Sequence, residues 1–266
     1  MRAGLCRAAV GAALAVAIAV GGTAQPAQAA FPGNVTLPPA GPFVNLAFAA
    51  YKLIDGSLSP SDVERLLLTM IAASNQAGSE MISHIDAHVA ARAVGEARGL
   101  TIRFQNYQNM RQTWELFFFA GDAVGAASID RTEFNATTDR KAADAIGTAL
   151  NVVYPMARTA VHDAGYAQTA QDTLKRDYIQ ALEAIVARLE PVCTSTVAPD
   201  TPAFINEVRY ECVAANGERV SDYQVRNVLT GKWLRGPVNV DQLKVDSAIH
   251  SSWLTAGAIL PTLRTP

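Results

Sequence analysis

The chain has 266 residues, half of them hydrophobic, and carries 22 basic and 24 acidic side chains. Its length allows one large domain or two small ones with a buried core. The slightly acidic balance gives no electrostatic argument for a nucleic-acid partner or for an anionic lipid surface. Phosphate-binding glycine loops, dinucleotide fingerprints and calcium loops are missing, so the sequence predicts no cofactor.

The first 29 residues have the three parts of a secretory signal. Arg2 and Arg7 form a short basic end, and residues 8–20 are uncharged and apolar. Small residues then lead to Ala-Gln-Ala at 27–29, which matches the small-x-small cleavage pattern. We therefore expect a secreted, extracellular protein, cleaved after about Ala29. The mature chain would keep 20 basic and 24 acidic residues, and no later segment reaches the about 20 apolar residues that span a bilayer.

A proline-rich leader follows the signal, and a helical region follows the leader. Residues 30–42 carry four prolines and two glycines, which favour an extended segment. Residues 43–190 then show the apolar spacing of helices. Helices joined by short connections are usually antiparallel neighbours, so we predict an elongated antiparallel helical bundle.

The first main helix of this bundle is predicted to begin at Ser59, where a hydroxyl cap precedes Pro60. Its amphipathic stripe continues to Gly95 and Gly99, where we expect the pattern to end. An element of about 35 residues would be roughly 50 Å long. Such a helix packs either along its own elongated bundle or against a second copy of the chain, and the sequence leaves both arrangements open.

Three further helices are predicted at about 101–119, 138–161 and 167–189. Gly121 and Gly125 weaken the pattern after the first of these. Pro155 is expected to kink the second, and Pro191 follows the end of the third.

From Cys193 onward, alternating residues and turn signals replace the helical spacing. Asn216-Gly217 predicts a hairpin with a two-residue type I′ turn, which would set Tyr210 opposite Tyr223 and Val208 opposite Val225. A loop near 200–202 and a turn at 230–231, which would bring Trp233 beside Val228, complete a four-stranded meander.

This pairing would place Cys193 opposite Cys212. They are the two cysteines left after cleavage, and in an oxidising compartment they most simply form one structural disulfide. Residues 240–263 are predicted to add a C-terminal helix. The predicted fold is therefore α+β, mainly α, with a helical bundle over 43–190 and a disulfide-tied antiparallel β-meander with a C-terminal helix over 191–266.

Glu80, His84 and His88 are spaced by four residues, so on a helix they share one face. Histidine pairs at this spacing can bind zinc or another transition metal, and a carboxylate one turn away is a reasonable third ligand. The hydrolase pattern H-E-x-x-H is absent. The alternative is that Glu80 and His84 lie on a polar edge of the bundle while His88 pairs with a partner in the seam between helices.

Phe117, Phe118 and Phe119 lie in the most apolar segment of the mature chain, residues 116–127. A helical bundle that hides such a segment and later exposes it resembles, in outline only, helical pore-forming toxins. Three consecutive phenylalanines cannot all face one way on a helix. We expect most of the segment to be core and at least one ring to contact solvent, a membrane or a partner.

His162 and Asp163 are adjacent near the predicted end of a helix. Neighbouring helix residues point about 100° apart, so we expect these side chains not to meet. A basic group near a helix C-terminus is favourable for the helix dipole alone, and no G-x-S-x-G nucleophile motif is present. The sequence therefore predicts no catalytic residue.

These observations favour an exported, non-catalytic scaffold or binding protein of the cell envelope or extracellular space. The alanine-rich signal is of bacterial type. The partner would be an unidentified protein or envelope component, bound by the β-module or by a groove of the bundle. Two alternatives stay open: a membrane-active protein using residues 116–127, and a metal-binding protein or metalloenzyme using Glu80, His84 and His88.

Overall fold

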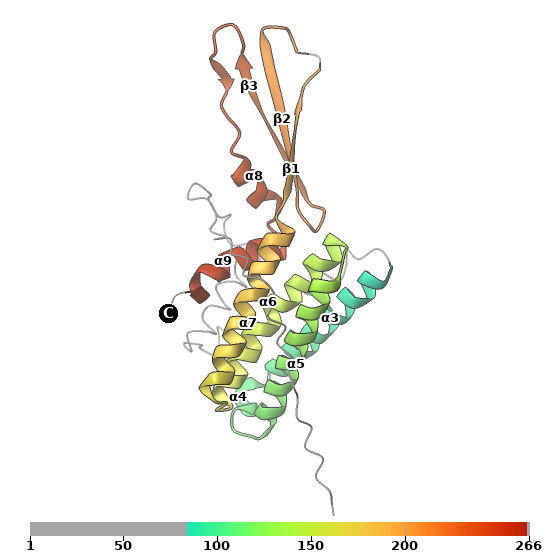
Figure 1. The fold of residues 1–266 in the computed structure, drawn as a ribbon, viewed down its shortest axis with the longest axis vertical. Helices are drawn as coiled ribbons and strands as arrows, with labels where there is room; N and C mark the ends of the chain where they lie inside the picture. The colour runs from blue at the N-terminus through green and yellow to red at the C-terminus, as the bar shows by residue number, and fades with distance from the viewer. Residues whose placement is uncertain (1–83, 200, 265–266) are drawn as a thin grey trace, which may run out of the picture.

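The computed structural model describes residues 84–199 and 201–264. The signal, the proline-rich leader, the predicted start of the first helix and Glu80 lie outside them. The described residues form seven helices, α3 to α9, and one four-stranded antiparallel sheet. Helices α3, α5, α6 and α7 lie side by side, and the sheet projects from one end of them (Figure 1). The predicted α+β, mainly α fold is confirmed.

The bundle helices are α3 (His84–Phe104), α4 (Tyr107–Met110), α5 (Glu115–Ala136), α6 (Arg140–Asp163) and α7 (Gln168–Leu189). The last two match their predicted ranges to within two residues. The sequence predicts that the first helix ends near Gly95 and Gly99, but α3 runs through both to Phe104. The single helix predicted at 101–119 is wrong, because these residues form the end of α3, α4, a turn at 111–114 and the start of α5, which then runs through Gly121 and Gly125. A glycine inside a helix costs only about 1 kcal/mol. Burial of the apolar faces of these helices exceeds that cost.

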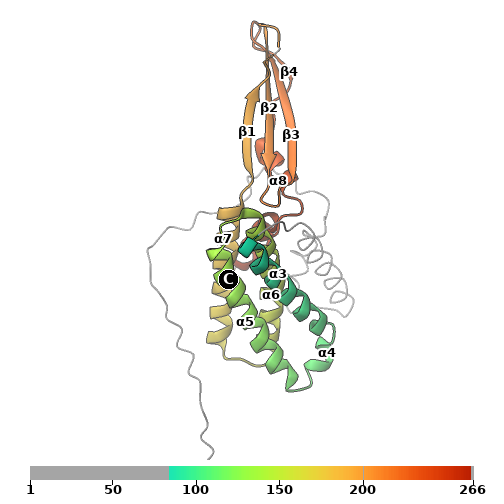
Figure 2. The ribbon, with the colours of Figure 1, turned by 90° about the vertical axis from the view of Figure 1, so that its right-hand side faces the viewer.

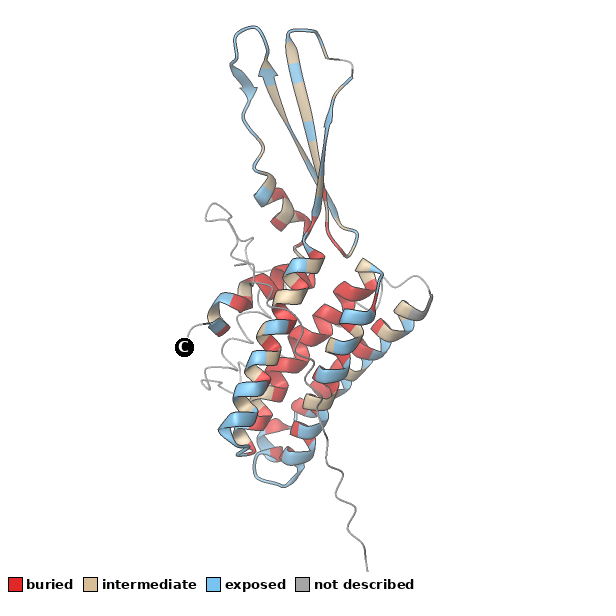
Figure 3. Cartoon of the chain, in the orientation of Figure 1, coloured by how far each residue is buried: buried red, intermediate tan, exposed pale blue. Residues whose placement is uncertain are grey.

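Helix α6 lies at the centre of the bundle, in contact with α3, α5, α7 and α9. Every residue from Ala142 to Ala157 is buried, including Pro155. A helix in contact with several others is buried around most of its circumference, and the polar side chains of Asp144, Thr148 and Asn151 are buried with it. Figure 3 shows that buried residues concentrate in this part of the molecule, whereas the sheet is mostly exposed or half-buried.

Charged side chains from two other helices fix the short connection between α5 and α6. Arg188 on α7 donates to the carbonyl oxygen of Phe134 near the end of α5. Asp86 on α3 accepts hydrogen bonds from the backbone N–H groups of Asp139 and Thr138, where α6 begins. These bonds, that from Asp139 foremost, hold the pKa of Asp86 below its usual value. The antiparallel turn between α5 and α6 is therefore tied to α3 and α7.

The sheet is a meander of β1 (Val192–Val197), β2 (Ile205–Val213), β3 (Arg219–Asn227) and β4 (Trp233–Arg235), paired in chain order. The bundle lies at one end of it, so both faces are open over most of their length (Figure 2). The predicted β2–β3 register is wrong by one residue, because Tyr210 lies opposite Asp222 and Val208 opposite Gln224.

The turn chemistry explains this shift. The backbone N–H of Ala214 donates to Glu218 O at 2.9 Å, and that of Gly217 donates to Ala214 O at 3.0 Å. With Gly217 at φ +92°, the loop has three residues, a turn followed by a left-handed glycine, rather than the predicted two. One additional residue moves each side chain of β3 to the other face. Trp233 is likewise paired with Arg226 and not with Val228.

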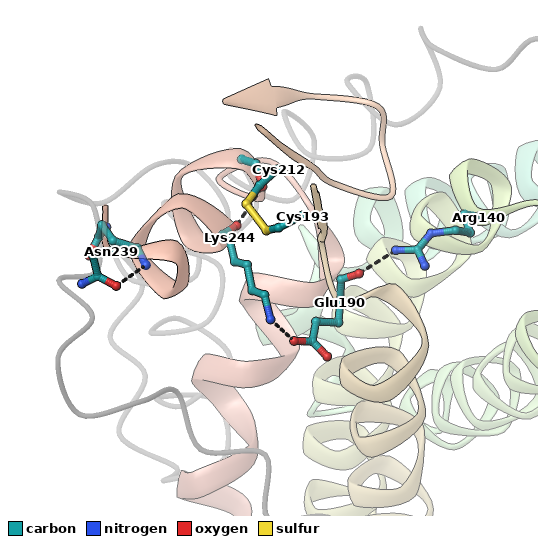
Figure 4. Close-up of a disulfide and its surroundings, with 8 residues drawn as sticks. Arg140, Glu190, Cys193, Cys212, Asn239 and Lys244 are labelled. Carbon is teal, nitrogen blue, oxygen red and sulfur yellow. Dashed lines mark hydrogen bonds and ion pairs between the residues drawn. A yellow bond between two sulfur atoms is a disulfide. The ribbon is translucent and has the colours of Figure 1, made fainter. Parts of the chain in front are cut away.

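Cys193 and Cys212 form the predicted disulfide between β1 and β2 (Figure 4). The bridge lies at the end of the sheet next to the bundle, where α8 (Val240–Ser247) packs on β1, β2 and β3. Glu190, just before β1, is held from both sides. Its carbonyl oxygen accepts a bond from Arg140 at 2.7 Å, and its carboxylate pairs with Lys244 on α8. The disulfide thus ties β1 to β2 at this end of the sheet, and Glu190 connects the end of α7 to α6 and α8.

The C-terminal segment forms two helices instead of the predicted one, because α9 (Ser252–Arg264) turns back onto α6 and α7. Asp144 on α6 causes the break. Its Oδ1 atom accepts bonds from the Ser251 hydroxyl, the Ser252 hydroxyl and the Ser252 backbone N–H, all at 2.8 Å. Burial raises the pKa of Asp144 to about 6, against the effect of these bonds. A buried carboxylate therefore lies at the N-terminus of α9, where the helix dipole favours it.

Candidate functional site

The predicted metal ligands lie at the edge of the described chain. His84 is the first residue of α3, and His88 lies one turn further on with its side chain exposed. Glu80 lies outside the described residues. Within residues 84–199 and 201–264, no three His, Cys, Asp or Glu side chains gather in a metal-binding group. The Glu80, His84 and His88 site remains a prediction.

The three phenylalanines of α5 divide between core and surface. Phe119 is buried, together with Ala120 and Ala123, whereas Phe117 and Phe118 are exposed. Across the part of the chain that the structure describes, no helix has both the length and the apolar character needed to cross a membrane. The 116–127 segment therefore contributes one face to the core and one to the surface.

At this end of the bundle, exposed aromatic rings surround a shallow pocket. Trp114 is 68% exposed, and its ring meets Phe118 edge-on with the centroids 4.9 Å apart. The pocket has a volume of about 380 Å³ and is lined by Arg103, Asn106, Met110, Trp114, Glu115 and Phe118. Arg103 is paired with Asp122 at 2.6 Å, and Glu115 adds a carboxylate, so the pocket has no single sign of charge.

Next to α4, Asp163 anchors a polar cluster. It accepts a bond from the Tyr107 hydroxyl at 2.7 Å, pairs with Arg111 at 2.9 Å and contacts His162 at 2.9 Å. Burial acts to raise the pKa of Asp163, but the bonds from Tyr107 and His162 and the charge of Arg111 outweigh it, so the pKa is lowered. The expectation that His162 and Asp163 do not meet is wrong, because their side chains converge at the last turn of α6. The cluster ties α4 to the end of α6, which is a structural role.

Asp130 on α5 is a buried carboxylate without a hydrogen-bond partner among the described residues. Burial, reinforced by the neighbouring charges of Glu96 and Glu133, raises its pKa to about 7. Arg92 pairs with Glu133 rather than with Asp130. The group is buried, so it affects stability and is not open to a ligand from solvent.

In the part of the chain that the structure describes, an exposed apolar surface lies at the far end of the sheet, and we call it the distal patch. It comprises five side chains that the bundle does not cover: Phe204, Val228, Leu229, Trp233 and Leu234. Leu229 is 81% exposed, and residues 228–237 are exposed without interruption. Turns usually carry polar residues and glycine, so an apolar turn at the end of a projecting sheet is unusual.

The backbone of this turn is held by several hydrogen bonds. The Asn227 side-chain oxygen accepts bonds from the N–H groups of Leu229 and Thr230, both at 3.0 Å. Gly231 takes φ +68°, which closes the turn. The N–H of Val228 donates to Phe204 O at 2.9 Å, so the β3–β4 turn and the β1–β2 loop lie side by side. The distal patch is therefore displayed on an ordered frame.

Sequence reasoning located this turn but missed the patch. The segment Val-Leu-Thr-Gly-Lys-Trp-Leu at 228–234 has four apolar residues where a polar turn is the rule, and this signal was available from the sequence. That these residues lie far from the bundle is a property of the tertiary structure.

Comparison with known proteins gives no match: no family model, no curated protein and no solved structure is significantly similar to this chain.

Proposed function

We propose that this protein is an exported, non-catalytic binding protein of the cell envelope or extracellular space, in which the bundle is the scaffold and the distal patch contacts the partner. The observation that carries the proposal is the exposure of five apolar side chains on an ordered turn and its neighbouring loop and strand, at the end of a sheet that the bundle leaves uncovered. Several apolar side chains exposed together at one end of a folded protein often mark an interaction site.

The junction supports this role. Glu190 connects the end of α7 to Arg140 on α6 and to Lys244 on α8, and the disulfide and the packing of α8 brace the adjoining end of the sheet, so the patch is presented at a set position. A partner that binds such a preorganised surface does not have to order it first, which lowers the entropic cost of binding.

The experiment measures binding of the fluorescently labelled mature protein to envelope fragments of the producing cells. We expect saturable binding that is lost in the double variant Val228→Ser with Leu229→Ser. The matched control is Phe117→Ser with Phe118→Ser, which removes two exposed apolar side chains from the opposite end of the molecule. Binding that survives the first pair and is lost in the second would reject the distal patch as the contact.

A second function, membrane activity of residues 116–127, is favoured by the exposure of Trp114, Phe117 and Phe118. Insertion would also have to expose Phe119 and the buried alanines of α5, which pack against α6. The test is leakage of liposomes by the mature protein across a range of pH, and by the variant Phe118→Asp. Leakage that Phe118→Asp suppresses would support membrane activity, and no leakage at any pH would exclude it.

A further inference from the structure

The charges around the distal patch differ from those of the whole chain. Residues 223–240 carry three basic side chains, Arg226, Lys232 and Arg235, and no acidic one. The neighbouring loop, residues 197–206, carries a single acidic residue. Asp222 borders the first of these stretches and Glu207 the second, so the excess of cations is confined to the turn itself, residues 226–232, which carries Arg226 and Lys232 and no acidic residue.

Among the described residues, one of these three basic side chains has an acidic partner. Arg235 pairs with Asp222 at 2.6 Å. Arg226 donates to the carbonyl oxygen of Gly231 at 3.1 Å and lies 5.6 Å from the Trp233 ring centroid, so it keeps its net charge beside an aromatic ring. Lys232 is exposed on the turn itself. Two cations thus flank the exposed Val228 and Leu229.

The distal patch and its flanking cations combine a tryptophan, aliphatic side chains and basic groups. These are the groups that bind at the interface of a negatively charged bilayer. Tryptophan prefers the headgroup level, aliphatic side chains enter the acyl boundary, and lysine and arginine attract anionic headgroups. A protein partner of standard interface size would bury about 800 Å² on each side. The distal patch is one turn with an adjoining loop and strand, so its shape suits a lipid surface better than such an interface.

We infer that the distal patch docks on an anionic lipid surface, with Val228 and Leu229 entering the headgroup region and Arg226 and Lys232 binding lipid phosphates. The inference rests on the proposed function and names the partner class for the same surface. The overall negative charge of the chain is no obstacle, because charges more than a Debye length of about 8 to 10 Å from the membrane are screened at physiological salt.

The test uses the mature protein, purified as cells export it, and two kinds of vesicle: phosphatidylglycerol mixed with phosphatidylcholine, and phosphatidylcholine alone. We expect co-sedimentation with the anionic vesicles only, weakened by salt. Val228→Ser with Leu229→Ser should reduce binding at least about tenfold, and Lys232→Gln about fivefold, the contribution of one cation near an anionic surface. Phe117→Ser with Phe118→Ser should leave binding unchanged.

A second readout reports the position of the tip. The variant Trp114→Phe keeps two tryptophans, Trp233 and Trp253. Because Trp253 is buried in the bundle, a change in tryptophan fluorescence on binding reports the surroundings of Trp233. We expect its emission to move to shorter wavelength with anionic vesicles.

Three results would overturn the inference: equal binding to both vesicles, no binding to either, or loss of binding only in the variant Phe117→Ser with Phe118→Ser. If vesicles fail but binding to envelope fragments still requires Val228 and Leu229, the proposed function stands with a different partner. If both fail, the proposed function fails as well.

Discussion

Gly147 on α6 lies so close to Ser252 on α9 that a Cβ atom on the glycine would be 2.5 Å from the Ser252 hydroxyl oxygen and 3.0 Å from its Cβ. The C-terminal helix can therefore pack here only against a residue without a side chain. This contact joins residues about 100 positions apart and seats α9 on the bundle next to Asp144.

The first prediction follows from this contact. Gly147→Ala should lower the free energy of unfolding by about 1 to 3 kcal/mol, because the added methyl group overpacks the α6–α9 interface. The control is Gly125→Ala in the interior of α5, where an added Cβ would meet no atom of the described residues within 4 Å. That change should raise stability by up to about 1 kcal/mol through helix propensity. Guanidinium unfolding measures both, and a stabilised Gly147→Ala protein would contradict the structure.

The second prediction concerns Asp130, whose pKa is raised from 3.8 to about 7 in the folded protein, first by burial and then by Glu96 and Glu133. The folded state therefore holds this proton more tightly than the unfolded state. Its contribution to stability is fully present below about pH 4 and is lost as the pH rises to about 7. Removing the charge with Asp130→Asn should abolish this loss.

Urea unfolding of both proteins at pH 5 and at pH 8 measures the effect. From pH 5 to pH 8, the free energy of unfolding of Asp130→Asn should rise by about 2 to 3 kcal/mol relative to that of the wild type. This follows from 1.36 kcal/mol for each pH unit between pH 5 and the raised pKa. Asp163, whose pKa is lowered, provides a control, because it is ionised in both the folded and the unfolded state from pH 5 to pH 8, so Asp163→Asn should change stability equally at both pH values. Parallel pH profiles for wild type and Asp130→Asn would show that Asp130 is ionised without penalty.

The third prediction concerns the disulfide. Replacing Cys193 and Cys212 by alanine should lower the free energy of unfolding by about 3 kcal/mol, because the bridge closes a loop over a sequence separation of 19 residues. The sheet end of the molecule should show the largest increase in amide hydrogen exchange, since β1 is an edge strand that pairs only with β2. Reduction of the wild type should give the same loss. A loss below about 1 kcal/mol in both experiments would mean that strand pairing and the packing of α8 hold β1 and β2 together without the bridge.

The fourth prediction tests the metal hypothesis. If Glu80, His84 and His88 form a site, the mature protein purified without chelator carries stoichiometric metal by mass spectrometry, and His84→Ala with His88→Ala loses it. His162→Ala, which changes an exposed histidine at the end of α6, should retain the metal. A metal-free wild-type protein after incubation with zinc would remove the hypothesis.

The sequence alone was sufficient for features that depend on local chemistry. The hydrophobic period predicted helices α6 and α7, and Pro191 marked the end of the bundle. Turn residues predicted the meander, and the cysteine count predicted the Cys193–Cys212 pairing. These signals act over a few residues, so they can be recognised without knowing the rest of the fold.

Tertiary structure decided the rest. Glycines at 95, 99, 121 and 125 did not end their helices, because burial of the opposite faces exceeds a local cost of about 1 kcal/mol each. The β2–β3 register depends on whether Gly217 closes a loop of two or three residues, a choice that the Asn-Gly pair permits either way. The return of α9 to the bundle depends on Gly147 and Asp144, which lie far from α9 in the chain. The distal patch is exposed because the bundle lies at the other end of the sheet, a long-range arrangement that no local pattern of residues encodes.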